Sequence, residues 1–282
     1  MMKLLKLEYY KNLNYTPFKI FTILYFAILV VFLCIGLIDL KLFGSTINLK
    51  EQGFYNFPEI WNFTTWTVAL LKIFLGLIIV FSICQEFSNR MFKQNTIDGL
   101  SREEFIGSKL LTIGIFTFIS TVLVFAITMF LGYKYSTTTT ESSLVYKEIF
   151  FVGNYFVKLF SFFCLLMFLS ILLRKSVFVF LAFFVLWVGE SILGGIETYS
   201  KVAGTQAAQR NEILQNEFFF SKLLPLESMS NLIPAPWFRL NMAKALGLKY
   251  EFTYPTESLI ACLIWCGLFI FGSYLILKKR DW

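Results

Sequence analysis

Long apolar stretches alternate with short polar ones along most of the chain, and this alternation predicts the architecture. Six stretches are long enough to form helices that cross the apolar core of a bilayer, which takes about 20 residues. They cover residues 20–40, 65–84, 105–133, 149–173, 176–196 and 256–277. Only Arg174 and Lys175 separate the fourth stretch from the fifth, so these two helices should form a tight hairpin. We therefore predict an all-α polytopic membrane protein with a single transmembrane domain over residues 1–282.

Residues 1–19 precede the first stretch and have a different pattern. Lys3, Lys6 and Lys11 alternate with leucine and tyrosine residues, which is typical of a helix that lies on the membrane surface. The segment leads into a full-length span without a small-residue cleavage site, so a cleaved signal peptide is not expected. We predict an N-terminal interfacial helix.

Residues 85–109, QEFSNRMFKQNTIDGLSREEFIGSK, form a polar and charged corner between the second and third stretches. Glu86 and Arg90 are four residues apart and can pair on one helical face. Gly99 suits the position just past a helix end, where a left-handed backbone is needed. Ser101 and Glu104 have the spacing of a capping box, which begins a new helix. The pattern predicts helix, break, helix, and on these features alone it is best interpreted as a well-capped turn.

The loop at residues 197–255 is much longer than the other interruptions. Its first part is polar, and a proline-punctuated apolar part, KLLPLESMSNLIPAPWF, follows. Loops of this length are usually functional or disordered, and this one is too apolar for disorder. We predict a folded element that rests on the outer leaflet or dips into it, with a short helix near residues 237–248.

The basic residues set the orientation. If the N-terminus is cytoplasmic, thirteen Lys and Arg residues flank the spans on the inside and four lie in the two short outer loops. The inner set is Lys3, Lys6, Lys11, Lys19, Arg90, Lys93, Arg102, Lys109, Arg174, Lys175, Lys278, Lys279 and Arg280, and the outer set is Lys41, Lys50, Lys134 and Lys147. Because positive charge collects on the cytoplasmic side, both termini and residues 85–109 should be cytoplasmic, with residues 197–255 outside.

Composition agrees with a membrane protein and narrows its chemistry. Apolar residues make up 57% of the chain and charged residues 15%, whereas about a quarter of residues in soluble proteins are charged. Histidine is absent, which removes histidine bases and histidine metal sites. The five cysteines lie in apolar runs without metal-ligand or redox spacing, and no GxxxxGK[ST] motif is present. We predict no catalytic residue, no metal site and no cofactor in this chain. The net charge of +7 follows the spans and does not suggest nucleic acid.

Three charged residues lie inside the predicted spans. Counted from the cytoplasmic ends at 1.5 Å per residue, Lys72 and Glu190 lie roughly 20 Å and 22 Å deep, and Lys158 roughly 24 Å. An unpaired charge at the bilayer centre costs at least about 2.5 kcal/mol, so such residues tend to face a partner or a wet cavity. We predict that Glu190 faces the interior and pairs with Lys72 or with polar groups near it. Alternatively, each reaches the outer headgroups alone.

Taken together, these features resemble the membrane subunits of ABC transporters of the type-2 exporter class. The likeness covers nearly the whole chain: a surface helix, six spans with both ends inside, a polar first cytoplasmic loop, and an external helical element between spans five and six. The most specific part is E-x-x-x-R followed by IDGLSREEFIGSKLL. The family usually has Gly-Thr shortly after the glutamate, where this chain has Asn89, Arg90 and Met91.

The resemblance implies a function for the corner. In such transporters a coupling helix on this loop docks in a cleft of a separate ATPase subunit. By this resemblance, the residues expected to contact the ATPase are Glu86, Arg90, Phe92, Lys93, Gln94, Thr96, Asp98, Gly99, Leu100, Ser101, Arg102 and Glu103. Two permease subunits, as a homodimer or with a close relative, would assemble with two ATPase subunits that bind ATP and magnesium. The location would be the bacterial inner membrane.

The leading hypothesis is therefore a permease subunit of an ATP-driven exporter that moves substrate out of the cytoplasm or the inner leaflet. The alternative is a non-transporting membrane module that passes ATPase-driven motion to an envelope partner. A lined cavity would favour export, and tight packing would favour the alternative. An intramembrane enzyme is a weak third class, because no convincing Ser–Lys or carboxylate motif is present. The sequence leaves the substrate open.

Overall fold

The computed structural model describes residues 16–34, 40–42, 45–47, 53–89, 91, 94, 97, 99, 101–137, 141–204, 218–236 and 254–279. Within these ranges the fold is almost entirely helical. The long helices are α2 (Thr16–Cys34), α3 (Ile60–Ala69), α4 (Lys72–Ser88), α6 (Arg102–Tyr135), α8 (Phe150–Leu173), α9 (Ser176–Val202) and α13 (Thr256–Lys279). The short elements are β1 (Leu40–Leu42), β2 (Ser45–Ile47), α7 (Ser142–Val145), η2 (Phe220–Leu223) and α11 (Pro225–Asn231). The two strands form an antiparallel pair in which Leu40 lies opposite Ile47.

Five helical segments in the described part of the chain are long and apolar enough to cross a membrane, which confirms the multi-pass prediction. They are Ile60–Ser88, Arg102–Tyr135, Ser143–Leu173, Ser176–Val202 and Thr256–Lys279. The predicted first span, residues 20–40, corresponds to α2, whose apolar part is the shorter stretch Phe18–Cys34. Of the predicted interfacial helix at residues 1–19, residues 1–15 lie outside the described residues and residues 16–19 belong to α2. The helix expected at residues 237–248 also lies outside the described residues.

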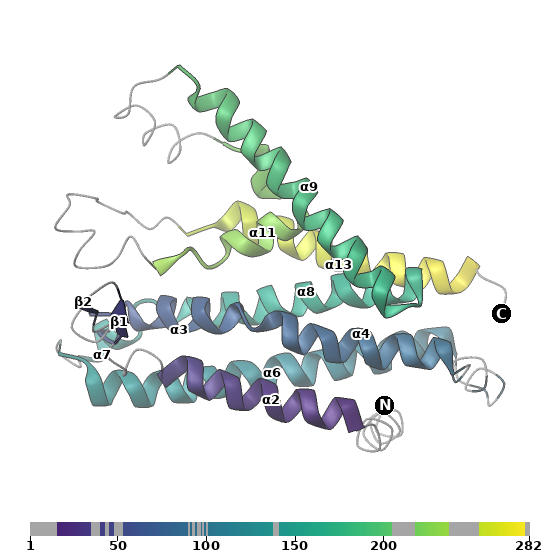
Figure 1. The fold of residues 1–282 in the computed structure, drawn as a ribbon, viewed down its shortest axis with the longest axis horizontal. Helices are drawn as coiled ribbons and strands as arrows, with labels where there is room; N and C mark the ends of the chain where they lie inside the picture. Colours follow the sequence, from purple (N-terminus) through teal and green to yellow (C-terminus); the bar gives the residue numbers. More distant parts are fainter. Residues whose placement is uncertain are drawn as a thin grey trace.

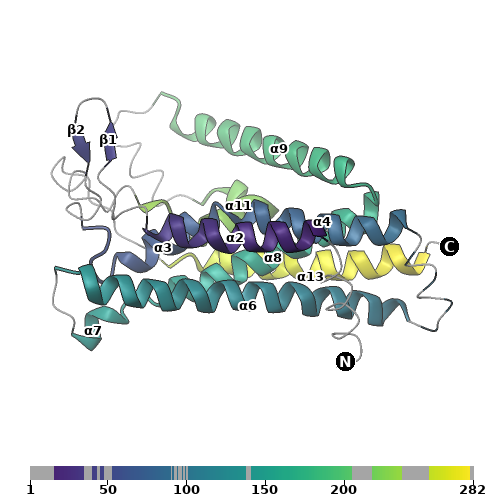
Figure 2. The same cartoon turned by 60° about the horizontal axis from the view of Figure 1, so that its bottom comes forward.

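Helix α8 is the centre of the bundle. It packs against α3, α4, α6, α9 and α13, and Figures 1 and 2 show α2, α3, α4, α6 and α13 running alongside it. Its side chains are buried on several faces and include Tyr155, Phe162 and Phe163. A helix that is apolar all round is expected in such a central position.

The second predicted span is two helices rather than one. The turn at Leu70 and Leu71 separates α3 from α4, and both amides there bond to carbonyls three residues earlier. Just before the turn, the hydroxyls of Thr64, Thr65 and Thr67 donate to carbonyls four residues earlier, at 2.6–2.8 Å. Such back-bonding bends helices. We attribute the break to this run of threonines, so the span starts five residues earlier than the predicted residue 65 and is bent.

Polar side chains also tie the bundle together. The hydroxyl of Ser120 on α6 lies 2.7 Å from that of Tyr25 on α2 and 2.8 Å from that of Tyr155 on α8. All three side chains are buried. Because buried hydroxyls must find partners, this cluster fixes how α2 and α6 sit against α8.

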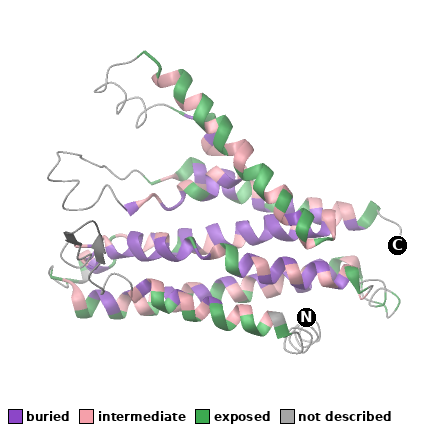
Figure 3. Ribbon diagram, in the orientation of Figure 1, coloured by how far each residue is buried: buried purple, intermediate pink, exposed green. Residues whose placement is uncertain are grey.

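Helix α9 leaves the bundle. After the tight turn at Arg174 and Lys175, which confirms the predicted hairpin, α9 diverges from the other long helices in both views (Figures 1 and 2). Only Val179 of its side chains is buried, and Figure 3 shows exposed and half-buried residues along its length. One end of the bundle gathers the start of α2, the end of α4, the start of α6, the α8–α9 turn and the end of α13 (Figure 1); we call it the corner end.

Candidate functional site

The corner between α4 and α6 has the predicted capping chemistry. Gly99 has a φ of 92°, so its backbone is left-handed as expected. Ser101 caps α6: its hydroxyl accepts from the amide of Glu104 at 3.1 Å, and the Glu104 carboxylate accepts from the amide of Ser101 at 2.9 Å. The reciprocal bonds satisfy two amides at the start of α6. They fix the angle at which the corner enters the bundle.

A buried ion pair closes the corner from inside. The ammonium of Lys109 on α6 donates to the carboxylate of Glu86 on α4. Their side chains are only 3% and 1% exposed, and the ammonium also lies 5.1 Å from the centre of the Phe105 ring. In this apolar setting the pair ties the last turn of α4 to the second turn of α6.

The corner is also tied to the last helix. The guanidinium of Arg102 donates to the carbonyl of Lys278 at 2.6 Å, and the hydroxyl of Tyr274 donates to the carboxylate of Glu103 at 3.2 Å. The first turn of α6 thus holds the last turn of α13. A displacement of the corner therefore reaches α4 through Glu86 and α13 through Arg102 and Glu103.

These contacts change the interpretation of the predicted ATPase-contact residues. Glu86 is not a surface residue, and it pairs with Lys109. Its predicted pairing with Arg90 lies outside the described residues. Arg102 and Glu103 are engaged with α13, while Gln94, Gly99 and Ser101 are exposed. The remaining predicted residues, Arg90, Phe92, Lys93, Thr96, Asp98 and Leu100, lie outside the described residues.

Ile97 is an additional candidate that the predicted set omits. It is helical, and 77% of it is exposed at the corner. An exposed large apolar side chain beyond the end of a span is not explained by contact with lipid. A signal was present in the sequence, because Ile97 is an apolar residue inside a polar loop.

At the other side of the molecule, residues 218–236, here called the docked segment, fold back onto the spans. Helix α11 lies beside α13 and α8 (Figure 1), and Met229, Leu232 and Ile233 are buried. The segment was predicted to be folded, and its described part is. Its backbone needs partners because it lies among apolar helices.

Side chains of the spans supply those partners. The amide of Asn154 donates to the carbonyl of Leu232 at 2.9 Å, and that of Asn62 donates to the carbonyl of Pro234 at 3.0 Å. The indole of Trp265 donates to the carbonyl of Leu223 at 2.8 Å. The docked segment is therefore anchored to α3, α8 and α13.

Two charged residues of the spans, Glu190 and Lys158, bind opposite ends of α11. The carboxylate of Glu190 accepts from the amides of Leu226 and Glu227 at 2.9 Å and 3.0 Å, and the ammonium of Lys158 donates to the carbonyl of Ser230 at 3.3 Å. An anion at the N-terminus and a cation at the C-terminus both suit the helix dipole. Leu224, at the N-cap position of α11, has no side chain that can accept a hydrogen bond. The first amides of α11, which have no partner within the helix, therefore donate to Glu190.

The predicted pair of Glu190 with Lys72 does not form in the described structure. Lys72 is half-buried, and its ammonium lies 4.7 Å from the centre of the Phe162 ring on α8. That cation–π contact offsets part of the cost of holding the charge among apolar side chains. Each charge therefore has a partner of its own, which corrects the prediction.

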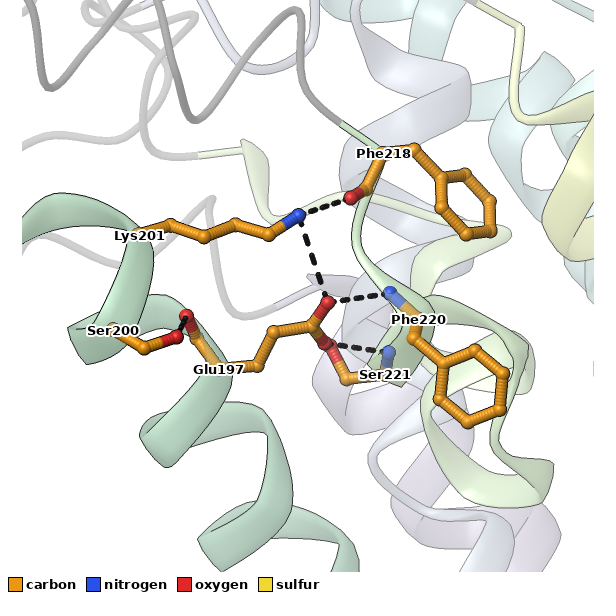
Figure 4. Close-up of polar contacts among 6 residues, drawn as sticks. All are labelled: Glu197, Ser200, Lys201, Phe218, Phe220 and Ser221. Carbon is orange, nitrogen blue, oxygen red and sulfur yellow. Dashed lines mark hydrogen bonds and ion pairs between the residues drawn. The ribbon is translucent and has the colours of Figure 1, made fainter.

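A second glutamate of α9 binds the docked segment in the same way. Glu197 follows Glu190 by seven residues, so both lie on one face of the helix. Its two oxygens accept from the amides of Phe220 and Ser221, each at 2.7 Å. Lys201 lies 3.6 Å from Glu197 and also donates to the carbonyl of Phe218 (Figure 4).

A cavity of about 610 Å³ lies between α9 and the docked segment. Its walls include Glu190, Gly194 and Tyr199 on one side, and Ser221 and Glu227 on the other. This volume is in the range of small-molecule sites. Within the described ranges, no three His, Cys, Asp or Glu side chains gather in a way that could hold a metal ion. Of the five cysteines, all of them unbonded thiols, four are buried and Cys34 is half-buried.

Comparison with known proteins gives a family but no function. A family described as a protein of unknown function (DUF2705) matches residues 47–282, which is most of the chain. No curated protein matches. No solved structure matches either.

Proposed function

We propose that this chain, which belongs to the DUF2705 family, is the membrane-spanning permease subunit of an ATP-driven exporter of the ABC type. The observation that carries the proposal is the corner. It is capped at Gly99 and Ser101, closed by the buried pair of Glu86 with Lys109, and fastened to α13 through Arg102. Because its described residues are tied to α4, α6 and α13, the corner transmits displacement from a docked partner into the bundle.

In this proposal α2 is a sixth span, and both termini are cytoplasmic with the corner. Helix α2 supports this by lying along the bundle and joining the buried hydroxyl cluster through Tyr25. Two ATPase subunits bind ATP and magnesium below two permease subunits in the bacterial inner membrane. Closure of the ATPases moves the corners and switches the cavity between its two access states.

Export is favoured over a module that signals to an envelope partner. The described part of the predicted external loop is bound to the chain's own spans through Asn154, Lys158 and Trp265. It also leaves a cavity of about 610 Å³ against α9. A surface built to recruit another protein would be expected to keep more of its apolar side chains free.

The first test is the composition of the complex. Co-expression with an ATPase subunit encoded beside this chain, followed by native mass measurement in detergent, should give two permease and two ATPase subunits. Six spans with short cytoplasmic loops make half a transporter, which is why the number should be two. A stable complex of one permease with one ATPase, or no ATPase at all, would contradict the proposal.

The second test uses Ile97. Ile97→Asp should weaken ATPase binding at least about fivefold, because a charge at an apolar anchor of an interface costs more than about 1 kcal/mol. Tyr146→Asp is the matched control: Tyr146 is also a large side chain, 47% exposed, but it directly follows α7, which lies at the opposite end of the bundle from the corner (Figure 1).

Arg102→Glu is a less specific probe, because Arg102 also holds the carbonyl of Lys278. The affinity of each variant for the ATPase would be measured in lipid nanodiscs. Equal affinities for the Ile97 and Tyr146 variants would exclude this face as the docking site.

A further inference from the structure

The outer half of α9 is held mainly by polar contacts. Past Glu190, the side chains of Ile192, Leu193, Ile196 and Tyr199 are all more than half exposed. Against the docked segment, α9 presents Gly194, and a Cβ atom there would lie 3.6 Å from that of Ser221, which is ordinary contact. Among the described residues, this face meets the docked segment through a glycine and polar side chains, namely Gly194, Glu190, Glu197 and Lys201.

Lys201 donates to the carbonyl of Phe218 in the docked segment, and the two glutamates of this face share one design. Glu190 and Glu197 each accept from two successive backbone amides, at 2.7–3.0 Å. Both carboxylates are half-buried, so water can replace the amides when α9 moves. Such bonds are charge-assisted and directional. Breaking them nevertheless does not require packed apolar side chains to separate.

The docked segment does not need α9 to stay in place. Asn154 and Lys158 of α8 and Trp265 of α13 hold it from the other side. At its opposite end, α9 is joined to α8 by the tight turn at Arg174 and Lys175. The helix therefore has one end fixed by the turn to α8, an outer half held by polar contacts, and a partner that stays in place if those contacts break.

We propose that the outer half of α9 is a gate and that Glu190 and Glu197 are its latch. When both carboxylates leave their amides, α9 tilts away from the docked segment and the cavity between them widens along its length. The latch residues lie on the walls of that cavity or beside it, so release and opening are one event. The gate is a property of this chain alone and does not depend on the proposed export function.

Ser221 provides the readout, because it is 8% exposed in the latched state. A Ser221→Cys variant, with the other cysteines replaced except Cys164, is treated with a maleimide in lipid nanodiscs. Labelling at residue 221 then measures the open fraction. Cys164 is fully buried in α8, so its labelling reports unfolding of the whole protein.

Glu190→Gln with Glu197→Gln should raise the labelling rate of residue 221 about tenfold, because neutral hydrogen bonds are about half as strong as charge-assisted ones. Cys164 should stay unlabelled. Glu257→Gln, which neutralises an exposed glutamate in the first turn of α13, is the matched control and should leave the rate unchanged. An unchanged rate in the double variant would overturn the proposal, as would an equal rise in the control.

Two further variants keep the proposal testable if the double glutamine variant does not fold. Glu197→Gln alone should give a rise of about threefold with Cys164 still protected, and no rise at all would count against the latch. Gly194→Cys with Ser221→Cys should form a disulfide, because the expected Cβ separation of 3.6 Å is close to the mean of about 3.8 Å. Failure to form it under oxidising conditions would show that the latched arrangement is not the resting state.

Discussion

Glu86→Ala should destabilise the folded protein by about 3–5 kcal/mol, because it removes the carboxylate that binds the buried ammonium of Lys109. Lys109→Ala should cost a similar amount for the same reason. Both side chains are almost fully buried, at 1% and 3% exposure, so solvent screening does not reduce the effect. The free energy of unfolding would be measured by chemical denaturation in mixed micelles.

The double variant tests whether the two single variants lose stability because they break one ion pair or for two unrelated reasons. Replacing Glu86 and Lys109 together by methionine removes both charges and keeps their volume, and buried pairs treated in this way often regain full stability. We therefore expect the double variant to be within about 1 kcal/mol of the parent protein. Glu257→Gln, which neutralises an exposed glutamate in the first turn of α13, should change stability by no more than about 0.5 kcal/mol. Single variants as stable as this control would rule out the pair.

The corner shows what local sequence can specify. The left-handed Gly99 and the capping box of Ser101 with Glu104 were predicted correctly, because both depend on residues within one turn of each other. The buried pairing of Glu86 with Lys109 was not predicted, for the opposite reason. Helical spacing pointed to Arg90, whereas Lys109 is 23 residues away and reaches Glu86 only after α4 and α6 pack together.

The spans also have some features that the sequence predicted and others that it did not. Long apolar runs predicted five of the membrane-crossing segments, because hydrophobicity over about 20 residues needs no knowledge of neighbours. The break at Leu70 was missed, although the threonines that precede it were visible in the sequence. The divergence of α9 could not be predicted, because its apolar composition is the same whether it faces protein or lipid.

Of the two kinds of partner predicted for Glu190, Lys72 does not pair with it in the described structure, whereas polar groups of the backbone do. Equal depth suggested that Glu190 meets Lys72, and depth was the only coordinate that the sequence supplied. A further signal was available: Pro225 marks the start of a helix whose N-cap position, Leu224, carries no capping group. The amides of such a helix must be satisfied from elsewhere, and Glu190 was a candidate.

A charge swap at these two positions should therefore fail to restore the protein. Glu190→Lys removes two charge-assisted bonds, each worth about 1.5–3 kcal/mol, and places a cation at the N-terminus of α11. We expect a loss of about 3 kcal/mol. Lys72→Glu replaces the cation over the Phe162 ring with an anion, which the ring face repels, and should cost about 2 kcal/mol.

The double variant, Lys72→Glu with Glu190→Lys, should lose the sum of the two single changes, because the two side chains share no partner in the described structure. Independent sites usually add within about 0.5 kcal/mol. An ion pair would instead let the swapped charges meet, and the double variant would then recover most of the loss. Recovery of more than half, measured by the same denaturation in micelles, would contradict the separate partners seen here. Additive loss would mean that Glu190 stabilises the fold through α11, where its carboxylate binds the amides of Leu226 and Glu227.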